Sequence, residues 1–271
     1  MTGAFGTKGA EGALAAKGWV RFGHDAGLSR WAEFAKTAAL ERMAEPAHRA
    51  EWLQCGGTWF VGVDTLSNDS RGDVAGSGPL PGPGYEAARA AYGDLPLHAG
   101  QVSVVWPGYP QPRKDESEAA FLYRQRRDAA HVDGLLAVGA SRARMLKERH
   151  AYILGLPLTP VGAGASPLTV WEGSHEVMRT AFASALEGVP PEDWGEVDLT
   201  EIYKAARRDV FARCARIAVP AQPGEAVLVH RLALHGVGPW EEAASAPPEG
   251  RMIAYFRPEF PGLGDDWLTA P

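Results

Sequence analysis

Residues 224–237 read GEAVLVHRLALHGV. A proline-glycine-glutamate turn at 223–225 opens this stretch, and the nearly continuous apolar run after it is typical of a buried β-strand. His235 stands at the end of the run, directly before Gly236. Because the end of a strand is where a side chain can face the mouth of a barrel, His235 is a candidate ligand or catalytic group.

Other short apolar segments, bounded by turn residues, recur on both sides of this stretch. Strands are predicted at 18–22, 58–66, 102–106, 152–156, 168–171, 217–219 and 252–257. Helical spacing of apolar residues predicts helices at 28–44, closed by Pro46, and at 199–213. The pattern favours a mainly β protein with flanking helices, built as an antiparallel barrel or sandwich.

The 271 residues are within the range of a single all-β domain, so we expect one domain over 1–271. Glycine and proline dominate the segment 72–86, which is predicted to be a loop and a possible lid. The helix within 199–214 interrupts the β pattern and is interpreted as an insertion packed on the barrel.

Composition excludes several classes of function. A net charge of −6 and a pI near 5.8 do not suit nucleic-acid or anionic-membrane binding, which needs a basic face. No apolar run is long enough to span a bilayer, and the N-terminus lacks the apolar core of a signal peptide, so a cytoplasmic protein acting on a small molecule is expected. The two cysteines, Cys55 and Cys214, are predicted to be reduced thiols.

Chemistry is suggested first by His131-Val132-Asp133. In a strand, residues i and i+2 point to the same face about 7 Å apart, so His131 and Asp133 can converge on one ion while Val132 faces away. The spacing alone is weak evidence, because such a tripeptide also arises by chance. Together with His235, however, it supplies two imidazoles and one carboxylate, the ligand set of a mononuclear non-haem iron(II) site with open positions.

The last predicted strand adds an arginine. Residues 250–257 read GRMIAYFR, and alternation places Arg251, Ile253, Tyr255 and Arg257 on one face. A buried arginine there requires an anionic partner. Arg251 is therefore a candidate for binding a carboxylate in two-point fashion, with Arg257 as a lesser alternative.

The order of these motifs resembles the phytanoyl-CoA dioxygenase family of iron(II)- and 2-oxoglutarate-dependent oxygenases, over roughly residues 15–260. The strand near 18–20 and the helix after it resemble the family's N-terminus. The segment 166–175, SPLTVWEGSH, is similar to the family's segment ending in Gly-Ser-His. The turn at 223–225 precedes the strand of the distal histidine in the expected place.

The resemblance implies a double-stranded β-helix, a jelly-roll, cupin-like barrel with flanking helices. It implies that His131, Asp133 and His235 bind Fe(II), and that Arg251 binds the C5 carboxylate of the cosubstrate 2-oxoglutarate. It also implies the use of dioxygen to hydroxylate a small organic substrate, with 2-oxoglutarate converted to succinate and carbon dioxide. The chain departs from the family at Glu172, where a proline is common, and in the longer interval before Arg251, so further cosubstrate contacts stay open.

Three alternatives are kept beside this interpretation. A halogenating enzyme of this type carries a small residue in place of the carboxylate, so Asp133 favours hydroxylation. A non-catalytic metal-binding barrel is the second alternative, although it has no chemical need for all four residues. The third is a cupin-like metalloenzyme that does not use 2-oxoglutarate, in which Arg251→Ala would be nearly silent.

Overall fold

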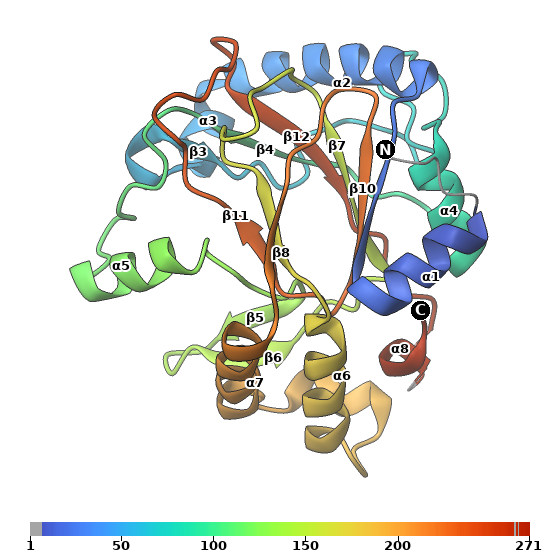
Figure 1. Ribbon diagram of the computed structural model, residues 1–271, viewed down its shortest axis with the longest axis vertical. Coiled ribbons are helices and arrows are strands. Elements are labelled where there is room, and N and C mark those ends of the chain that lie inside the picture. Colours follow the sequence, from blue (N-terminus) through green and yellow to red (C-terminus); the bar gives the residue numbers. More distant parts are fainter. Residues whose placement is uncertain (1–6, 263, 265) are drawn as a thin grey trace.

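The computed structural model describes residues 7–262, 264 and 266–271, and its centre is a pair of antiparallel sheets (Figure 1). The larger sheet has the strand order β1-β10-β7-β12-β4-β3-β2. Its strands are β1 (Trp19–Phe22), β10 (Ala226–His230), β7 (Tyr152–Pro157), β12 (Arg251–Phe256), β4 (Gln101–Val105), β3 (Trp59–Phe60) and β2 (Leu53–Gln54).

The smaller sheet has the order β11-β8-β9 and lies against the inner face of the larger one. It consists of β11 (His235–Val237), β8 (Leu168–Trp171) and β9 (Arg216–Val219). Apolar side chains of β7, β8, β9 and β10 fill the space between the two sheets. A separate hairpin pairs β5 (Leu135–Val138) with β6 (Ala143–Leu146). The protein is therefore mainly β, a double-stranded β-helix with flanking helices.

Four helices flank the larger sheet. They are α1 (Thr7–Lys17), α2 (Ala26–Ala44), α3 (Pro46–Trp52) and α4 (Pro83–Tyr92), and Figure 1 shows α2 running along one side of the sheet. Strand alternation explains this layer, because Met252, Ala254 and Phe256 of β12 point outward into the same core cluster as Trp31 of α2. The other face of β12 is left for the interior of the barrel.

Three more α-helices gather below the smaller sheet (Figure 1). α6 (Ser174–Ala185), α7 (Thr200–Arg213) and α8 (Asp266–Thr269) share a second core, together with the 3-10 helix η2 (Pro191–Glu196). The short 3-10 helix η1 (Cys55–Gly57) joins β2 to β3, and α5 (Glu118–Arg126) stands apart with no buried residue. No helix in the described part of the chain is both long and apolar enough to cross a bilayer.

Several elements differ from the prediction. The stretch 224–237 is not one strand: it forms β10 in the larger sheet, turns at 231–234, and continues as β11 in the smaller sheet, so His235 begins a strand instead of ending one. Only Trp59–Phe60 of the expected strand 58–66 is extended and paired. The loop predicted over 72–86 stops at Gly82, because Pro83 occupies the first turn of α4. The helical stripe predicted at 199–213 lies in α7.

Candidate metal centre

Two histidines face each other at the edge of the smaller sheet. His131 and His235 exchange both backbone hydrogen bonds, N–H of His131 to O of His235 at 2.8 Å and the reverse at 3.0 Å. This single antiparallel bridge takes the place of the longer strand expected around His131. It brings the two imidazole rings to 4.6 Å between centroids.

Asp133 completes a group of three side chains whose ligand atoms all lie within 4.8 Å of one another. Its Oδ1 atom is 3.1 Å from Nε2 of His131 and 3.8 Å from Nε2 of His235. Val132 points the other way, into the core around α6 and α7, and its N–H donates to the Tyr203 hydroxyl at 3.1 Å. Alternation along 131–133 is as the sequence predicts.

The backbone fixes which nitrogen of each ring faces the centre. Nδ1 of His131 lies 3.0 Å from the carbonyl of Ala129, and Nδ1 of His235 lies 2.9 Å from the carbonyl of Ala233. A carbonyl oxygen only accepts, so each Nδ1 carries a hydrogen, and Nε2 is the nitrogen that each ring directs toward the other two side chains. Neutral imidazoles held in this way are the usual form of metal-bound histidine.

Close backbone packing explains why the chain takes this path. The turn before His131 runs through two residues with positive φ, Asp128 and Ala129, and the carbonyl of Asp128 accepts the N–H of Val237 at 2.9 Å. A Cβ at Gly236 would meet that carbonyl at 2.2 Å. Glycine at 236 is therefore required for the two histidine segments to approach.

Burial and neighbouring charge set the protonation of the group. Burial lowers the pKa of His235 to about 4, against the opposing attraction of Asp133. Burial alone would raise the pKa of Asp133, but the Arg257 guanidinium and the two histidines outweigh it and hold that pKa well below its ordinary value. The side chains of Asp133 and His235 are 10% and 8% exposed, whereas that of His131 is 48% exposed, so the centre opens on the His131 side.

A cavity of about 220 Å³ adjoins the three side chains. Its walls come from the inner face of the larger sheet and from β8 and β11, and its lining includes Trp59, Gln101, Ser103, Ile153 and Tyr255. The Trp59 indole N–H donates to the Ser103 hydroxyl at 3.0 Å. Sequence reasoning did not identify these residues, because nothing in the local pattern shows which strands stand opposite the histidines.

Arg251 begins β12 on the inner face and is 2% exposed. It is paired across the sheet with Val105, which is paired in turn with Trp59 of the cavity wall. Within the described residues, neither terminal nitrogen of its guanidinium has a hydrogen-bond partner. A buried cation without a partner is costly, so an anion that reached this position would be stabilised there.

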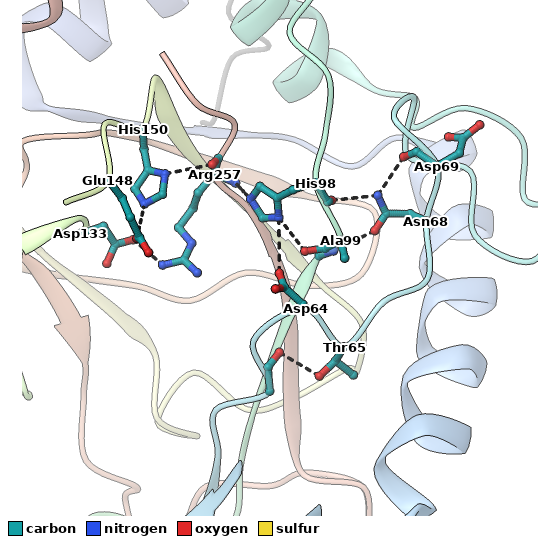
Figure 2. A network of polar contacts seen from close by, with 12 residues as sticks. Asp64, Thr65, Asn68, Asp69, His98, Ala99, Asp133, Glu148, His150 and Arg257 are labelled. Carbon is teal, nitrogen blue, oxygen red and sulfur yellow. Dashed lines mark hydrogen bonds and ion pairs between the residues drawn. The ribbon is translucent and has the colours of Figure 1, made fainter. Parts of the chain in front are cut away.

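Arg257 lies at the other end of the same face, just after β12, and its Nη1 is 3.4 Å from Oδ2 of Asp133 (Figure 2). It lines the metal cavity and also a second cavity of about 420 Å³. That second cavity is bordered by Asp64, His98, Glu148, His150 and Glu259. The two predicted arginines thus occupy different places, Arg257 beside the carboxylate ligand and Arg251 at the first residue of β12, outside the lining of the metal cavity.

Two buried histidines and two tryptophans near these motifs in sequence lie outside the lining of the metal cavity. His175 is fully buried with Nε2 2.9 Å from the carbonyl of Ala15, and His230 is buried beside it. Trp171 packs on Phe211, and Trp240 packs with the cluster around Cys55. The basic run before His131 is also engaged, since Arg124 pairs with Glu116. In the described part of the chain, no other three such side chains converge as 131, 133 and 235 do.

Comparison with known proteins supports the fold. No protein-family model matches the chain, and no curated protein matches it. Among solved structures, it is similar to a non-heme alpha-ketoglutarate-dependent carbocyclase, SnoK from nogalamycin biosynthesis, with 14% identity, TM-score 0.53, and 99% of this chain and 93% of that chain covered. It is also similar to AviO1 from Streptomyces viridochromogenes Tue57, with 15% identity, TM-score 0.50 and 100% of both chains covered. At these identities the likeness concerns the fold, and the chain has the jelly-roll barrel fold of these two proteins.

Proposed function

We propose that this protein is an iron(II)- and 2-oxoglutarate-dependent dioxygenase, of the kind represented by the phytanoyl-CoA dioxygenase family, that hydroxylates a small organic substrate. One observation carries the proposal. A donor set of two imidazole nitrogens and one carboxylate oxygen shares the barrel interior with a buried arginine whose terminal nitrogens have no hydrogen-bond partner among the described residues. An oxygenase that binds both a metal and a dicarboxylate needs both features.

The residues present fit Fe(II). Two neutral imidazoles and one carboxylate on one side of an ion leave its other positions free for a bidentate cosubstrate and dioxygen. His131, Asp133 and His235 would hold the iron, which supplies the activation of dioxygen when bound. The Nδ1 contacts to Ala129 and Ala233 orient both rings for this task.

The same geometry suits 2-oxoglutarate. The keto acid end would lie at the metal, and the C5 carboxylate would form a two-point salt bridge with Arg251. The cavity of about 220 Å³ is smaller than the ~300–1,000 Å³ typical of drug-sized ligands, and Arg251 lies outside its lining, across the sheet from Trp59 of its wall, so the C5 carboxylate would extend beyond the cavity to reach it. The substrate would then approach from the open side at His131.

The overall reaction balances. One oxygen atom of dioxygen enters the substrate as a hydroxyl group, and the other enters the carboxylate of succinate as 2-oxoglutarate loses carbon dioxide. The protein contributes binding, orientation and exclusion of water, while the iron carries the oxidation. Val61, Val63, Ile153 and Leu168 supply the apolar part of the cavity wall. Asp133 at the ligand position favours hydroxylation over halogenation.

The test is 2-oxoglutarate turnover. Protein supplied with Fe(II), 2-oxoglutarate and oxygen is expected to form succinate, and His235→Ala is expected to abolish it. The matched control is His24→Ala, because His24 is exposed, its ring bonds the Ser29 hydroxyl, and it lies outside the lining of the metal cavity. Succinate formed by the unaltered protein no faster than by His235→Ala would contradict the proposal.

A further inference from the structure

Asp133 has two carboxylate oxygens in different surroundings. Oδ1 faces Nε2 of both histidines, at 3.1 and 3.8 Å. Oδ2 lies 3.4 Å from Nη1 of Arg257 (Figure 2). A carboxylate can bind a metal through one oxygen or both, and here a half-buried guanidinium pairs with one of the two oxygens.

Arg257 is itself held from both sides of its backbone. Its N–H donates to Nε2 of His98 at 3.1 Å, and its carbonyl accepts from Nδ1 of His150 at 3.0 Å. Each histidine is anchored in turn, His98 through Nδ1 to the carbonyl of Ala99 at 2.6 Å and His150 through Nε2 to Glu148 at 3.1 Å. Figure 2 shows Arg257 between the two rings, with its side chain directed to Asp133.

This arrangement restricts where the guanidinium can go. His98 lies just before β4 and His150 lies just before β7, so two segments distant in sequence bond the backbone of Arg257 at the end of β12. The side chain is 17% exposed. The backbone of Arg257 is therefore fixed, and its guanidinium lies close to Oδ2 of Asp133. A side chain held in this way next to a metal ligand can set the orientation of that ligand.

We propose that Arg257 is a positioning residue that engages Oδ2 of Asp133, so that Asp133 binds the metal through Oδ1 alone. The inference rests on the proposed function for the identity of the metal site, and it adds how that site keeps its positions open. If Oδ2 also bound the metal, it would take a place that the cosubstrate or dioxygen needs. This role differs from that of Arg251, whose terminal nitrogens bond no carboxylate within residues 7–262, 264 and 266–271.

The test uses cobalt(II) as a spectroscopic probe of coordination number. Arg257→Gln removes the charge and shortens the reach, Arg257→Lys keeps the charge, and Arg213→Gln is the control, since it breaks the exposed Arg213–Asp209 pair on α7. Arg257→Gln is expected to retain bound cobalt but to change its visible absorption toward a higher coordination number. Arg257→Lys is expected to restore much of the original spectrum, and Arg213→Gln to leave it unchanged.

Cosubstrate binding gives a second readout. On the cobalt protein, 2-oxoglutarate is expected to bind about 10-fold more weakly in Arg257→Gln, the scale usual for a partner of a metal ligand. An unchanged cobalt spectrum in both Arg257 variants would overturn the inference. Cobalt spectra that change as expected, with no 2-oxoglutarate binding to any form, would support the role of Arg257 and contradict the proposed function instead.

Discussion

Replacing Arg251 by methionine is expected to have opposite effects on stability and on cosubstrate binding. In the part of the chain that the structure describes, both terminal guanidinium nitrogens of Arg251 are buried without a hydrogen-bond partner. Each unsatisfied buried donor costs about 1–3 kcal/mol, and an unpaired charge costs more. Methionine is shorter than arginine and carries neither the charge nor the N–H donors, so Arg251→Met removes that cost and is expected to raise the free energy of unfolding by about 1–3 kcal/mol.

The same substitution removes two charge-assisted hydrogen bonds to 2-oxoglutarate. At about 1.5–3 kcal/mol each, their loss weakens binding by roughly 100-fold or more. Arg251→Lys keeps the charge but loses the two-point geometry, so an intermediate affinity is expected. The assays are urea unfolding of chelator-treated protein and calorimetric titration of 2-oxoglutarate into manganese-loaded protein.

Arg231 provides the matched control, because it is also a fully buried arginine but a fully bonded one. Its guanidinium donates to the carbonyls of Trp267, Ala151, Ala270 and Pro271 at 2.8 to 3.2 Å. Arg231→Met is expected to destabilise the fold by roughly 3 kcal/mol or more, because it leaves buried carbonyl oxygens without hydrogen-bond donors. If Arg251→Met instead destabilised the metal-free protein and left 2-oxoglutarate affinity within about 3-fold, the reasoning about Arg251 would be refuted.

Two further results are expected. Folding lowers the pKa of His235 from 6.5 to about 4, so below pH 6.5 the unfolded chain is protonated before the folded one. The free energy of unfolding of the metal-free protein should therefore fall by about 1 kcal/mol between pH 7 and pH 5.5 because of this residue. In urea unfolding at the two pH values, His235→Gln should show a correspondingly smaller decrease. Gly236→Ala places a Cβ 2.2 Å from the carbonyl oxygen of Asp128, so cobalt affinity measured by equilibrium dialysis should fall at least about 10-fold. Gly12→Ala is the control and should leave the affinity unchanged, because a Cβ there meets no atom within 4 Å. Equal cobalt affinities of the two variants would show that the close approach at Gly236 is dispensable.

Strand alternation is what allowed the candidate site to be predicted. A period of two places His131 and Asp133 on one face and Arg251 on the inner face of its strand, and the structure has both arrangements. Alternation specifies a face but not a partner strand. The split of 224–237 between two sheets depends instead on the turn containing Arg231, whose acceptors include carbonyls near the end of the chain.

The contact between Arg257 and Asp133 could not be predicted from the sequence for the same reason. Sequence places it on the inner face of β12, where it is a lesser candidate for binding the cosubstrate. Its contact with Asp133 joins residues 124 positions apart, and its backbone partners His98 and His150 follow no local pattern. The cavity residues Trp59, Gln101 and Ser103 became visible for the same reason only when the pairing of β3, β4 and β12 was known.

Anaerobic titration of the iron(II)-loaded protein with 2-oxoglutarate, followed by visible absorption, tests the central claim most directly. The account predicts a metal-to-ligand charge-transfer band that saturates at an equimolar amount of 2-oxoglutarate, is lost in His235→Ala and requires far more cosubstrate in Arg251→Met. Iron shown to be bound at 131, 133 and 235, with no band at any concentration of 2-oxoglutarate, would contradict it.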